Sequence, residues 1–337
     1  MGVRFCVGCV ILFVAVLCAP ASVSAQGSAP VWEAPRTVHG YPDLQGVWAN
    51  NSATPLERPD EWTGKKELTD EEFAAFQAAA ADVTASGADA VFGDQLAFAA
   101  LAGLKDADSY DPATGNYNQF WMVERDFDNR TSLIIDPPDG RLPMLTADAQ
   151  SNGWGQPPSL ITEKADTWTD RPLNERCITY GVPSLFAGYN AYYQIFQSEN
   201  HAVVLMEMIH DARVIPIDGQ AHLSGDVRQL HGDSRGHWEG DTLVVETTNY
   251  SKMGAFWNAS TSLRVTERFT RVGFDMLHYE ITVNDPATWT QPWTVMIPLK
   301  RSDDPIFEYA CHEGNLGMEG ILAGYRAQER DTRGLSR

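Results

Sequence analysis

The segment 207–213 places ionisable side chains within an otherwise apolar stretch that has the composition of a β-strand. The ionisable residues of this segment include Glu207, His210 and Arg213. A histidine exchanges protons near neutral pH and can serve as a general acid or base, while an arginine can hold an anionic or carbonyl oxygen. Side chains on a strand alternate between its two faces, so His210 is expected opposite Glu207 and Arg213. We therefore predict either His210 or the Glu207/Arg213 pair at a site, and both together only with a bulge near Asp211.

A second candidate group lies nearer the C-terminus, in the segment 308–315. His312 and Glu313 could act as an acid/base pair, or His312 could pair with His210. A disulfide at the neighbouring Cys311 would fix this segment, and fixed side chains are what catalytic geometry requires. For both segments the alternative is a structural role. His210 would then be hydrogen-bonded at the end of a strand, and the polar groups of 308–315 would cap backbone groups in a segment anchored by the disulfide. The predicted catalytic residues are His210, His312, Glu207, Glu313 and Arg213.

Aromatic side chains are concentrated before and within the strand-rich part of the chain and could form the walls of a pocket. Trp121, Tyr193 and Tyr309 are predicted to bind substrate, by stacking against a ring or packing on an apolar body. Packing in the core is the alternative for each of them.

Three histidines permit a metal hypothesis: His222, His231 and His237, with Asp226 or Asp233 as an oxygen ligand. They lie in or beside expected turns, and the separation of six between His231 and His237 matches no common zinc site. The sequence also has no phosphate loop, dinucleotide-binding fingerprint or His-Glu-x-x-His motif. We predict neither a metal nor a cofactor.

The N-terminal residues have the features of a secretory signal peptide. Arg4 precedes a short apolar run over 5–17, and small residues follow as far as Ala25. We expect residues 1–25 to be removed, leaving Gln26 first, and a periplasmic or secreted location. The apolar run is too short to span a membrane.

Cleavage would leave two cysteines, Cys177 and Cys311. An even pair in an exported protein predicts a disulfide. The alternative is two buried thiols.

The composition is that of a globular protein, with 43% hydrophobic and 21% charged residues. Lys+Arg number 25 against 45 Asp+Glu, a formal charge of −20. This balance argues against a nucleic-acid partner and against adsorption to an anionic membrane. The expected partner is a small-molecule ligand or substrate, without membrane insertion; the oligomeric state is not predicted.

The chain divides into an extended N-terminal arm (26–66), a helical segment (67–105) and a β-barrel-like domain (106–337). Thr69 and Glu72 form a capping box that begins a helix over about 70–83, and a second helix is expected over about 89–104. The arm should pack on the body through Leu44, Val47 and Trp48.

Short strands separated by turns are expected from residue 131 onward. Leu277, Tyr279, Ile281 and Val283 alternate with polar residues, which is typical of a strand with one buried face. The pattern predicts a mainly β protein, with an antiparallel meander closed as a lipocalin-like barrel or a strongly curved sheet, and a β-sandwich as the alternative. The segment 232–236 is interpreted as a hairpin turn. The expected strands are 131–135, 191–197, 202–209, 211–217, 227–231, 241–248, 262–271, 276–283, 293–300 and 305–311.

Several segments together resemble a large family of secreted, uncharacterised bacterial proteins. The resemblance covers most of the chain after residue 25 and implies export, but it implies no activity. The segments that carry it are Tyr-Pro-Asp-Leu-Gln-Gly-Val-Trp (41–48), Arg-Thr-Ser-Leu-Ile (130–134), Asn-Glu-Arg-Cys (174–177), Glu-Met-Ile-His-Asp-Ala-Arg (207–213), Gly-Asp-Ser-Arg-Gly-His-Trp-Glu-Gly-Asp-Thr-Leu-Val-Val (232–245) and Glu-Tyr-Ala-Cys-His-Glu-Gly-Asn (308–315).

These features predict an exported enzyme that performs non-redox acid/base chemistry on a small apolar or aromatic molecule, as a lyase, isomerase or hydrolase. An exported binding protein with the same cavity but no catalysis is the alternative, and a structural protein without a ligand is a third hypothesis. A pocket with proton-transfer groups favours the enzyme, and purely apolar walls favour the binding protein.

Overall fold

An antiparallel β-sheet dominates the computed structural model, which describes residues 2, 32–85, 90–91, 93–104, 122–156, 165–313 and 315–332. Trp121 and, apart from residue 2, the predicted signal peptide lie outside these residues. Glu33–Arg337 form one compact unit, to which the following description applies. Its strands are β1 (Gly46–Ala49), β2 (Ile134–Asp136), β3 (Tyr192–Gln197), β4 (His201–Met206), β5 (Ala212–Pro216), β6 (Asp233–Glu239), β7 (Thr242–Thr248), β8 (Arg264–Arg271), β9 (Met276–Asn284) and β10 (Trp293–Ser302).

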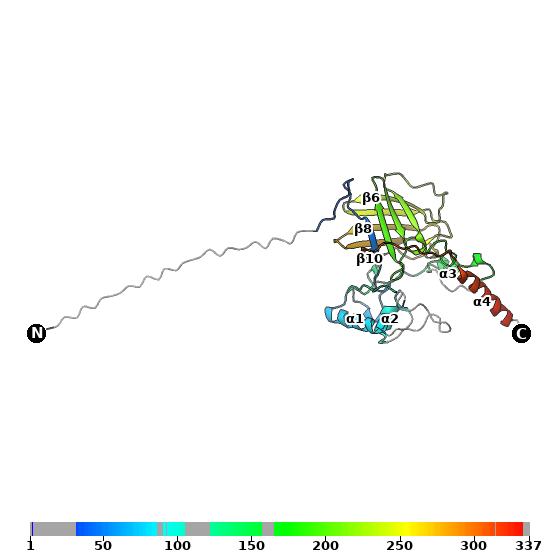
Figure 1. Cartoon of the computed structure of the whole chain (residues 1–337), viewed down its shortest axis with the longest axis horizontal. Coiled ribbons are helices and arrows are strands. Elements are labelled where there is room, and N and C mark those ends of the chain that lie inside the picture. Colours follow the sequence, from blue (N-terminus) through cyan, green and yellow to red (C-terminus); the bar gives the residue numbers. More distant parts are fainter. Residues whose placement is uncertain are drawn as a thin grey trace. The chain divides into compact units, whose positions relative to one another are not determined.

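The strands from β3 onward confirm the predicted meander. Their order in the sheet is β5-β4-β3-β1-β10-β9-β8-β7-β6, every neighbouring pair is antiparallel, and β2 pairs with β10 beside this path. In β9 the predicted alternation is present: Leu277, Tyr279, Ile281 and Val283 are buried, and the residues between them are half-buried. The buried face of the sheet therefore forms the main core (Figure 1).

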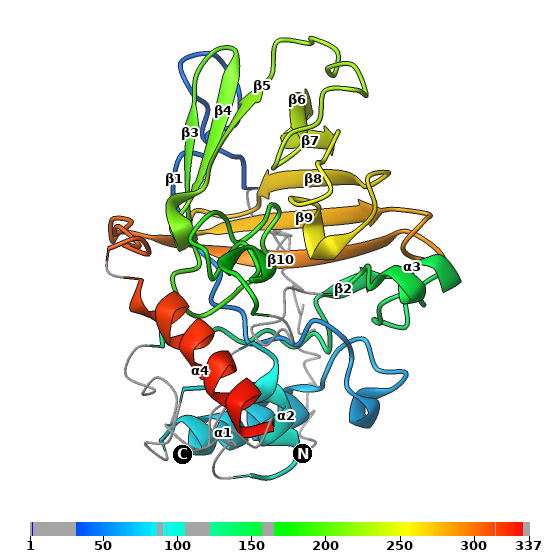
Figure 2. The ribbon, with the colours of Figure 1, turned by 90° about the vertical axis from the view of Figure 1, so that its right-hand side faces the viewer.

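The sheet is strongly curved, but its two edge strands are not joined by hydrogen bonds among the described residues. Side chains of the two edges nevertheless pack together. A Cβ placed on Gly236 of β6 would lie 2.7 Å from Ile217 Cγ2 and 3.1 Å from Ile215 Cγ2. Figure 2 shows β5 and β6 beside each other at the two edges of the sheet. Glycine at position 236 lets them approach closely, so side chains pack where a closed barrel would have a hydrogen-bonded ladder.

Strand β1 lies in the middle of the sheet, between β3 and β10. The sequence indicated only an extended arm here, because Pro and Gly surround the segment and it is short. Leu44 and Trp48 are fully buried in the main core together with residues of the sheet, so this part of the arm packs on the body. Trp48 Nε1 also donates to Leu44 O at 2.8 Å. The neighbouring strands make the segment a strand by pairing with it on both sides.

The helical segment contains α1 (Asp70–Ala85) and α2 (Gln95–Leu101). The predicted capping box is confirmed, because Thr69 Oγ1 accepts from Glu72 N at 3.3 Å and Glu72 Oε2 accepts from Thr69 N at 3.1 Å. The second helix is shorter than predicted and begins after Asp94. The two helices pack together around a small core of their own that includes Phe76 and Leu96.

Other parts of the chain differ from the sequence interpretation. Residues 227–231 and 305–311 form no strand, whereas the predicted turn over 232–236 largely belongs to β6. The unpredicted helices are α3 (Ala147–Asn152) and α4 (Leu316–Thr332); the 3-10 helices are η1 (Asp60–Trp62), η3 (Trp168–Asp170), η4 (Met208–His210) and η5 (Phe256–Asn258).

The strand expected over 202–209 ends at Met206, where η4 begins a tight turn. Ile209 and His210 have φ angles of 55° and 46°, which lie in the left-handed region. The alternation expected between Glu207, His210 and Arg213 therefore does not apply, because alternation requires extended backbone.

Candidate functional site

A cavity of about 1110 Å³ is the candidate site. Its wall is built from the segment after β1, the start of α2, the loops around β2 and α3, and the irregular segment that precedes β3. The lining is largely apolar, which suits a small molecule with an apolar body. The large apolar side chains in the wall include Leu133, Leu145, Leu185, Phe186, Phe256, Trp257 and Trp289.

A carboxyl group and a guanidinium group lie together in this wall. Asp94 Oδ2 accepts a hydrogen bond from Leu56 N at 3.0 Å, and burial raises the pKa of Asp94 to about 6 despite the nearby charge of Arg125. Arg125 donates through Nε to Asn51 O at 3.3 Å and through Nη2 to Ser52 O. Burial lowers the pKa of Arg125 to about 10, so it stays charged at neutral pH.

A second polar cluster surrounds Thr179, which also lines the cavity. Thr179 Oγ1 is 2.7 Å from Asp211 Oδ2, 2.8 Å from His231 Nε2 and 2.9 Å from Gly181 N. The Thr179 hydroxyl donates to Asp211 Oδ2, and its oxygen accepts from Gly181 N and from His231. Burial lowers the pKa of His231 against the opposing charge of Asp211. The donor and both acceptor positions of the Thr179 hydroxyl are thus engaged. Thr179 therefore holds the loop in place and is not a free nucleophile.

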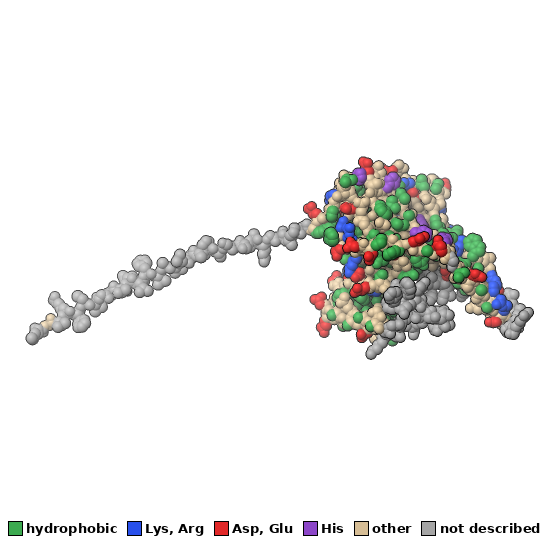
Figure 3. Space-filling view, viewed as in Figure 1, with side chains coloured by type: hydrophobic (Ala, Val, Ile, Leu, Met, Phe, Trp, Pro, Cys, Tyr) green, Lys and Arg blue, Asp and Glu red, His purple; other side chains and the backbone are tan. Residues whose placement is uncertain are grey.

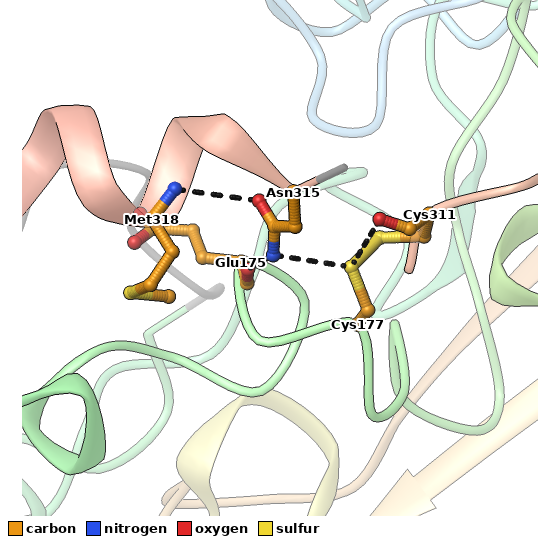
Figure 4. The surroundings of a disulfide bond; sticks show 5 residues. All are labelled: Glu175, Cys177, Cys311, Asn315 and Met318. Atoms are coloured by element: carbon orange, nitrogen blue, oxygen red, sulfur yellow. Dashed lines mark hydrogen bonds between the residues drawn. A yellow bond between two sulfur atoms is a disulfide. The ribbon is translucent and has the colours of Figure 1, made fainter. Parts of the chain in front are cut away.

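The predicted disulfide is confirmed: Cys177 is bonded to Cys311, with 5.6 Å between the two Cα atoms. Figure 4 shows that Asn315 extends this link, donating through Nδ2 to Glu175 O at 3.0 Å and accepting through Oδ1 from Met318 N at 3.3 Å. The bond ties the cavity-lining segment 169–187 to the start of α4. It also indicates a protein that resides outside the reducing cytoplasm.

Among the described residues, the predicted catalytic side chains form no hydrogen bond or ion pair with one another, although His210 N donates to Glu207 O at 3.1 Å. His210 is exposed in η4, and His312 and Glu313 are exposed beside the disulfide; none of the three lines the cavity. Glu207 is buried, and its Oε1 accepts from Phe307 N at 3.1 Å, which connects β4 to the segment after β10. Burial raises the pKa of Glu207.

Arg213 lies inside the curved sheet and is neutralised there. Its Nη2 lies 2.7 Å from Glu267 Oε1, its Nη1 contacts Glu267 Oε2, and Tyr279 donates to the same carboxylate. Burial opposes the charge of Arg213, but Glu267 outweighs it and raises the pKa of Arg213 above its usual value. With both acceptor oxygens engaged, Arg213 is a core ion pair and does not line the cavity.

Of the predicted substrate-binding aromatics within the described residues, neither Tyr193 nor Tyr309 lines the cavity. Tyr193 is buried in the sheet, donates to Ser184 O at 3.0 Å and packs edge-on against Tyr279. Tyr309 is half-buried in the segment after β10. Core packing therefore accounts for Tyr193.

The three histidines of the metal hypothesis have separate partners. His222 Nδ1 lies 2.9 Å from Asp233 Oδ2, His237 Nε2 lies 3.2 Å from Glu239 Oε1, and His231 contacts Thr179. The described residues contain no group of three or more His, Cys, Asp or Glu side chains suited to hold a metal ion.

The segment 232–236 has the Gly-x-Ser-x-Gly spacing of a hydrolase nucleophile elbow. The interpretation of this segment as a hairpin turn did not take that motif into account. Such an elbow places the serine on a sharp turn between a strand and a helix. Here Ser234 is buried within β6, which is followed by another strand, and its Oγ is 2.8 Å from Thr247 Oγ1. The serine is part of the sheet and not an exposed nucleophile.

Acidic side chains are dispersed among basic and hydrophobic ones on the face drawn in Figure 3. No helix within the described part of the chain has both the length and the apolar character needed to cross a bilayer. Comparisons with protein-family models, curated proteins and solved structures find no match for this chain. The geometry of the cavity is therefore the basis for a functional proposal.

Proposed function

We propose that this protein is a periplasmic or secreted enzyme that performs non-redox acid/base chemistry on a small, largely apolar or aromatic molecule. The reaction class is a lyase, isomerase or hydrolase, and the reaction takes place in the cavity. One observation carries the proposal: a carboxyl group, Asp94, has a pKa raised to about 6 in the wall of a mainly apolar cavity. Perturbed titration in a cleft is typical of catalytic groups.

Asp94 has the properties of a general base at neutral pH. A carboxyl group with a pKa of about 6 is mostly ionised at pH 7, yet it is more basic than an ordinary aspartate. Leu56 N holds one carboxylate oxygen, which orients the group. The positive charge of Arg125 beside it could stabilise negative charge that develops on a substrate oxygen when Asp94 removes a proton.

The test compares wild-type protein with Asp94→Asn in untargeted metabolite profiling of culture extracts. Asparagine keeps the size of the side chain and an acceptor for Leu56 N but removes the base. We expect wild-type protein to convert at least one metabolite, Asp94→Asn to convert it at least about a hundredfold more slowly, and Glu246→Gln, at an exposed position of β7, to match the wild type. Equal conversion by Asp94→Asn and wild type would remove Asp94 from the mechanism.

The apolar wall supports the alternative, an exported binding protein for a hydrophobic small molecule without catalysis. The same profiling separates the two proposals. A binding protein would retain a metabolite unchanged in both wild type and Asp94→Asn, whereas an enzyme would alter the amount of substrate and product. Mass spectrometry of the purified protein, including its N-terminus, also tests export through the expected start at Gln26.

A further inference from the structure

Buried polar atoms on the cavity wall lack protein partners. Within the described part of the chain, Arg125 Nη1, Asn174 Oδ1 and Arg176 Nε are buried and form no hydrogen bond, and all three residues line the cavity. Unsatisfied buried groups are uncommon, because each has lost its contact with water without gaining another partner. Two donors and one acceptor in the same wall point to a polar ligand group.

Arg176 differs from the other arginines of this region because no carboxylate of the described residues balances its charge. Arg171, five residues earlier in the same segment, is held by both oxygens of Glu175, at 2.7 Å and 2.9 Å. Arg125 interacts with the charges of Asp94 and Asp126. Among the described residues no carboxylate forms an ion pair with Arg176, and its guanidinium group lies over the ring of Trp168, 4.7 Å from the centroid.

This arrangement presents a cation that is held in place but not neutralised. Stacking on Trp168 occupies a face of the guanidinium group, so a planar acceptor would have to bind through its edge. The adjacent Cys177 is tied to Cys311, which limits movement of the backbone that carries Arg176. A planar cation with a fixed orientation suits a carboxylate, which accepts two parallel hydrogen bonds from it.

We infer that the cavity binds a carboxylic acid with an aromatic or alicyclic body, and that Arg176 receives its carboxylate. Asn174 Oδ1 accepts a hydrogen bond from a hydroxyl or N–H group of the same molecule, and the apolar wall receives the body. Arg176 and Asn174 are binding residues, and Asp94 remains the reacting group. The inference rests on the proposed function only in using the same cavity.

The experiment measures binding of matched probes to the full chain: benzoate, 1-naphthoate and indole-3-acetate, each against its neutral primary amide. Titration followed by ligand-observed NMR gives the Kd. We expect each carboxylate to bind roughly tenfold or more tightly than its amide, the range of one charge-assisted hydrogen-bonded pair. Arg176→Gln should lose this preference, and Arg268→Gln, at an exposed ion pair with Glu239, should keep it.

A second variant covers the case in which Arg176→Gln does not fold. Asn174→Asp keeps the size of the side chain and adds a negative charge two positions from Arg176, so it should weaken carboxylate binding and leave amide binding unchanged. Equal binding of acids and amides by wild type, no binding of any carboxylate probe, or an undiminished preference in both Arg176→Gln and Asn174→Asp would overturn the inference.

Failure of this inference and failure of the proposed function give different results. Binding is also measured with Asp94→Asn, which does not depend on turnover. Carboxylate binding that requires Arg176, without conversion of any metabolite, supports the inference and refutes the enzyme. Conversion of a neutral metabolite that is independent of Arg176 supports the enzyme and refutes the inference.

Discussion

Arg213 and Glu267 lie on strands from opposite halves of the sheet and meet in its interior, where Arg213 Nη2 is 2.7 Å from Glu267 Oε1. The strands β5 and β8 are far apart in the order of the sheet, so this contact requires strong curvature. The ion pair therefore links the two halves across the core.

Breaking this pair should destabilise the fold strongly. Glu267→Gln leaves the buried guanidinium group of Arg213 without a counter-charge, and we expect a loss of about 3–5 kcal/mol in the free energy of unfolding. Arg268→Gln removes an exposed ion pair with Glu239 and should cost much less, because solvent screens such pairs. Urea denaturation followed by fluorescence measures both. Similar losses for the two variants would show that the buried pair contributes no more than an exposed one.

The raised pKa of Asp94 predicts a dependence of stability on pH. Burial raises the folded-state pKa to about 6, above the ordinary value of an aspartate, so the folded protein binds the proton more tightly than the unfolded chain. The associated stability is fully present below about pH 4 and is lost as the pH rises through about 6. Relative to Asp94→Asn, the wild type should lose up to about 3 kcal/mol between pH 4 and pH 7.5. Denaturation at a series of pH values tests this, and a constant difference between the two proteins would contradict it.

Activity should change with pH in the opposite sense. If Asp94 is the base, kcat/KM should rise from pH 5 to pH 7 with an apparent pKa near 6 as the carboxyl group ionises. The profile is measured on the converted metabolite. A rate independent of pH in this window would argue against Asp94.

Gly236 should be required for the packing of β5 on β6. A methyl group at this position would meet Ile217 Cγ2 at 2.7 Å, so Gly236→Ala should lower the free energy of unfolding by about 1–3 kcal/mol. Gly225→Ala, where nothing lies within 4 Å of the added atom, is the matched control. Hydrogen exchange should increase selectively in β5 and β6. If both variants have the same free energy of unfolding, the two isoleucines can move aside for the methyl group and Gly236 is not required for this packing.

The disulfide should contribute to both stability and the site. Loop-entropy models for a closure of 134 residues give a stabilisation of up to about 4–5 kcal/mol. In a Cys177→Ser/Cys311→Ser variant we also expect faster hydrogen exchange in the cavity segment 169–187. Intact mass with and without reductant confirms the bond in the wild type. Unchanged exchange in this segment would show that the disulfide does not order the cavity wall.

Ser234 should be dispensable for activity in spite of its Gly-x-Ser-x-Gly context. Ser234→Ala removes the contact with Thr247, so it should cost about 1–2 kcal/mol in stability while conversion of the metabolite stays at the wild-type rate. A loss of activity in folded Ser234→Ala would support the alternative hypothesis that Ser234 is a hydrolase nucleophile.

The regular part of the sheet was predictable because its strands follow a simple physical pattern. Residues 276–284 alternate between a buried and a half-buried face, and the boundaries of β9 and β10 agree closely with those expected. Strand β6 was missed, since its Gly, Asp and Ser residues are typical of turns; pairing with β7 makes it a strand.

The candidate site was much less predictable. The expectation for His210 assumed extended backbone, and the left-handed turn at Ile209 removes that assumption. Thr179 and Arg176 lie in an irregular segment whose position depends on a bond to Cys311, far along the chain. Asp94 and Arg125 had no signal in the sequence, because their pKa shifts arise mainly from burial, which depends on the folded chain.

The bond between Cys177 and Cys311 also sets an order of events during maturation. The cavity segment is synthesised long before its partner cysteine, so it cannot be fixed until Cys311 has emerged and met an oxidant. In a reducing compartment the strands of the sheet could still pair, but the cavity segment 169–187 would not be fixed by the disulfide. Oxidation of the two thiols is thus the step that fixes the cavity wall, and it can follow only after both cysteines have been synthesised.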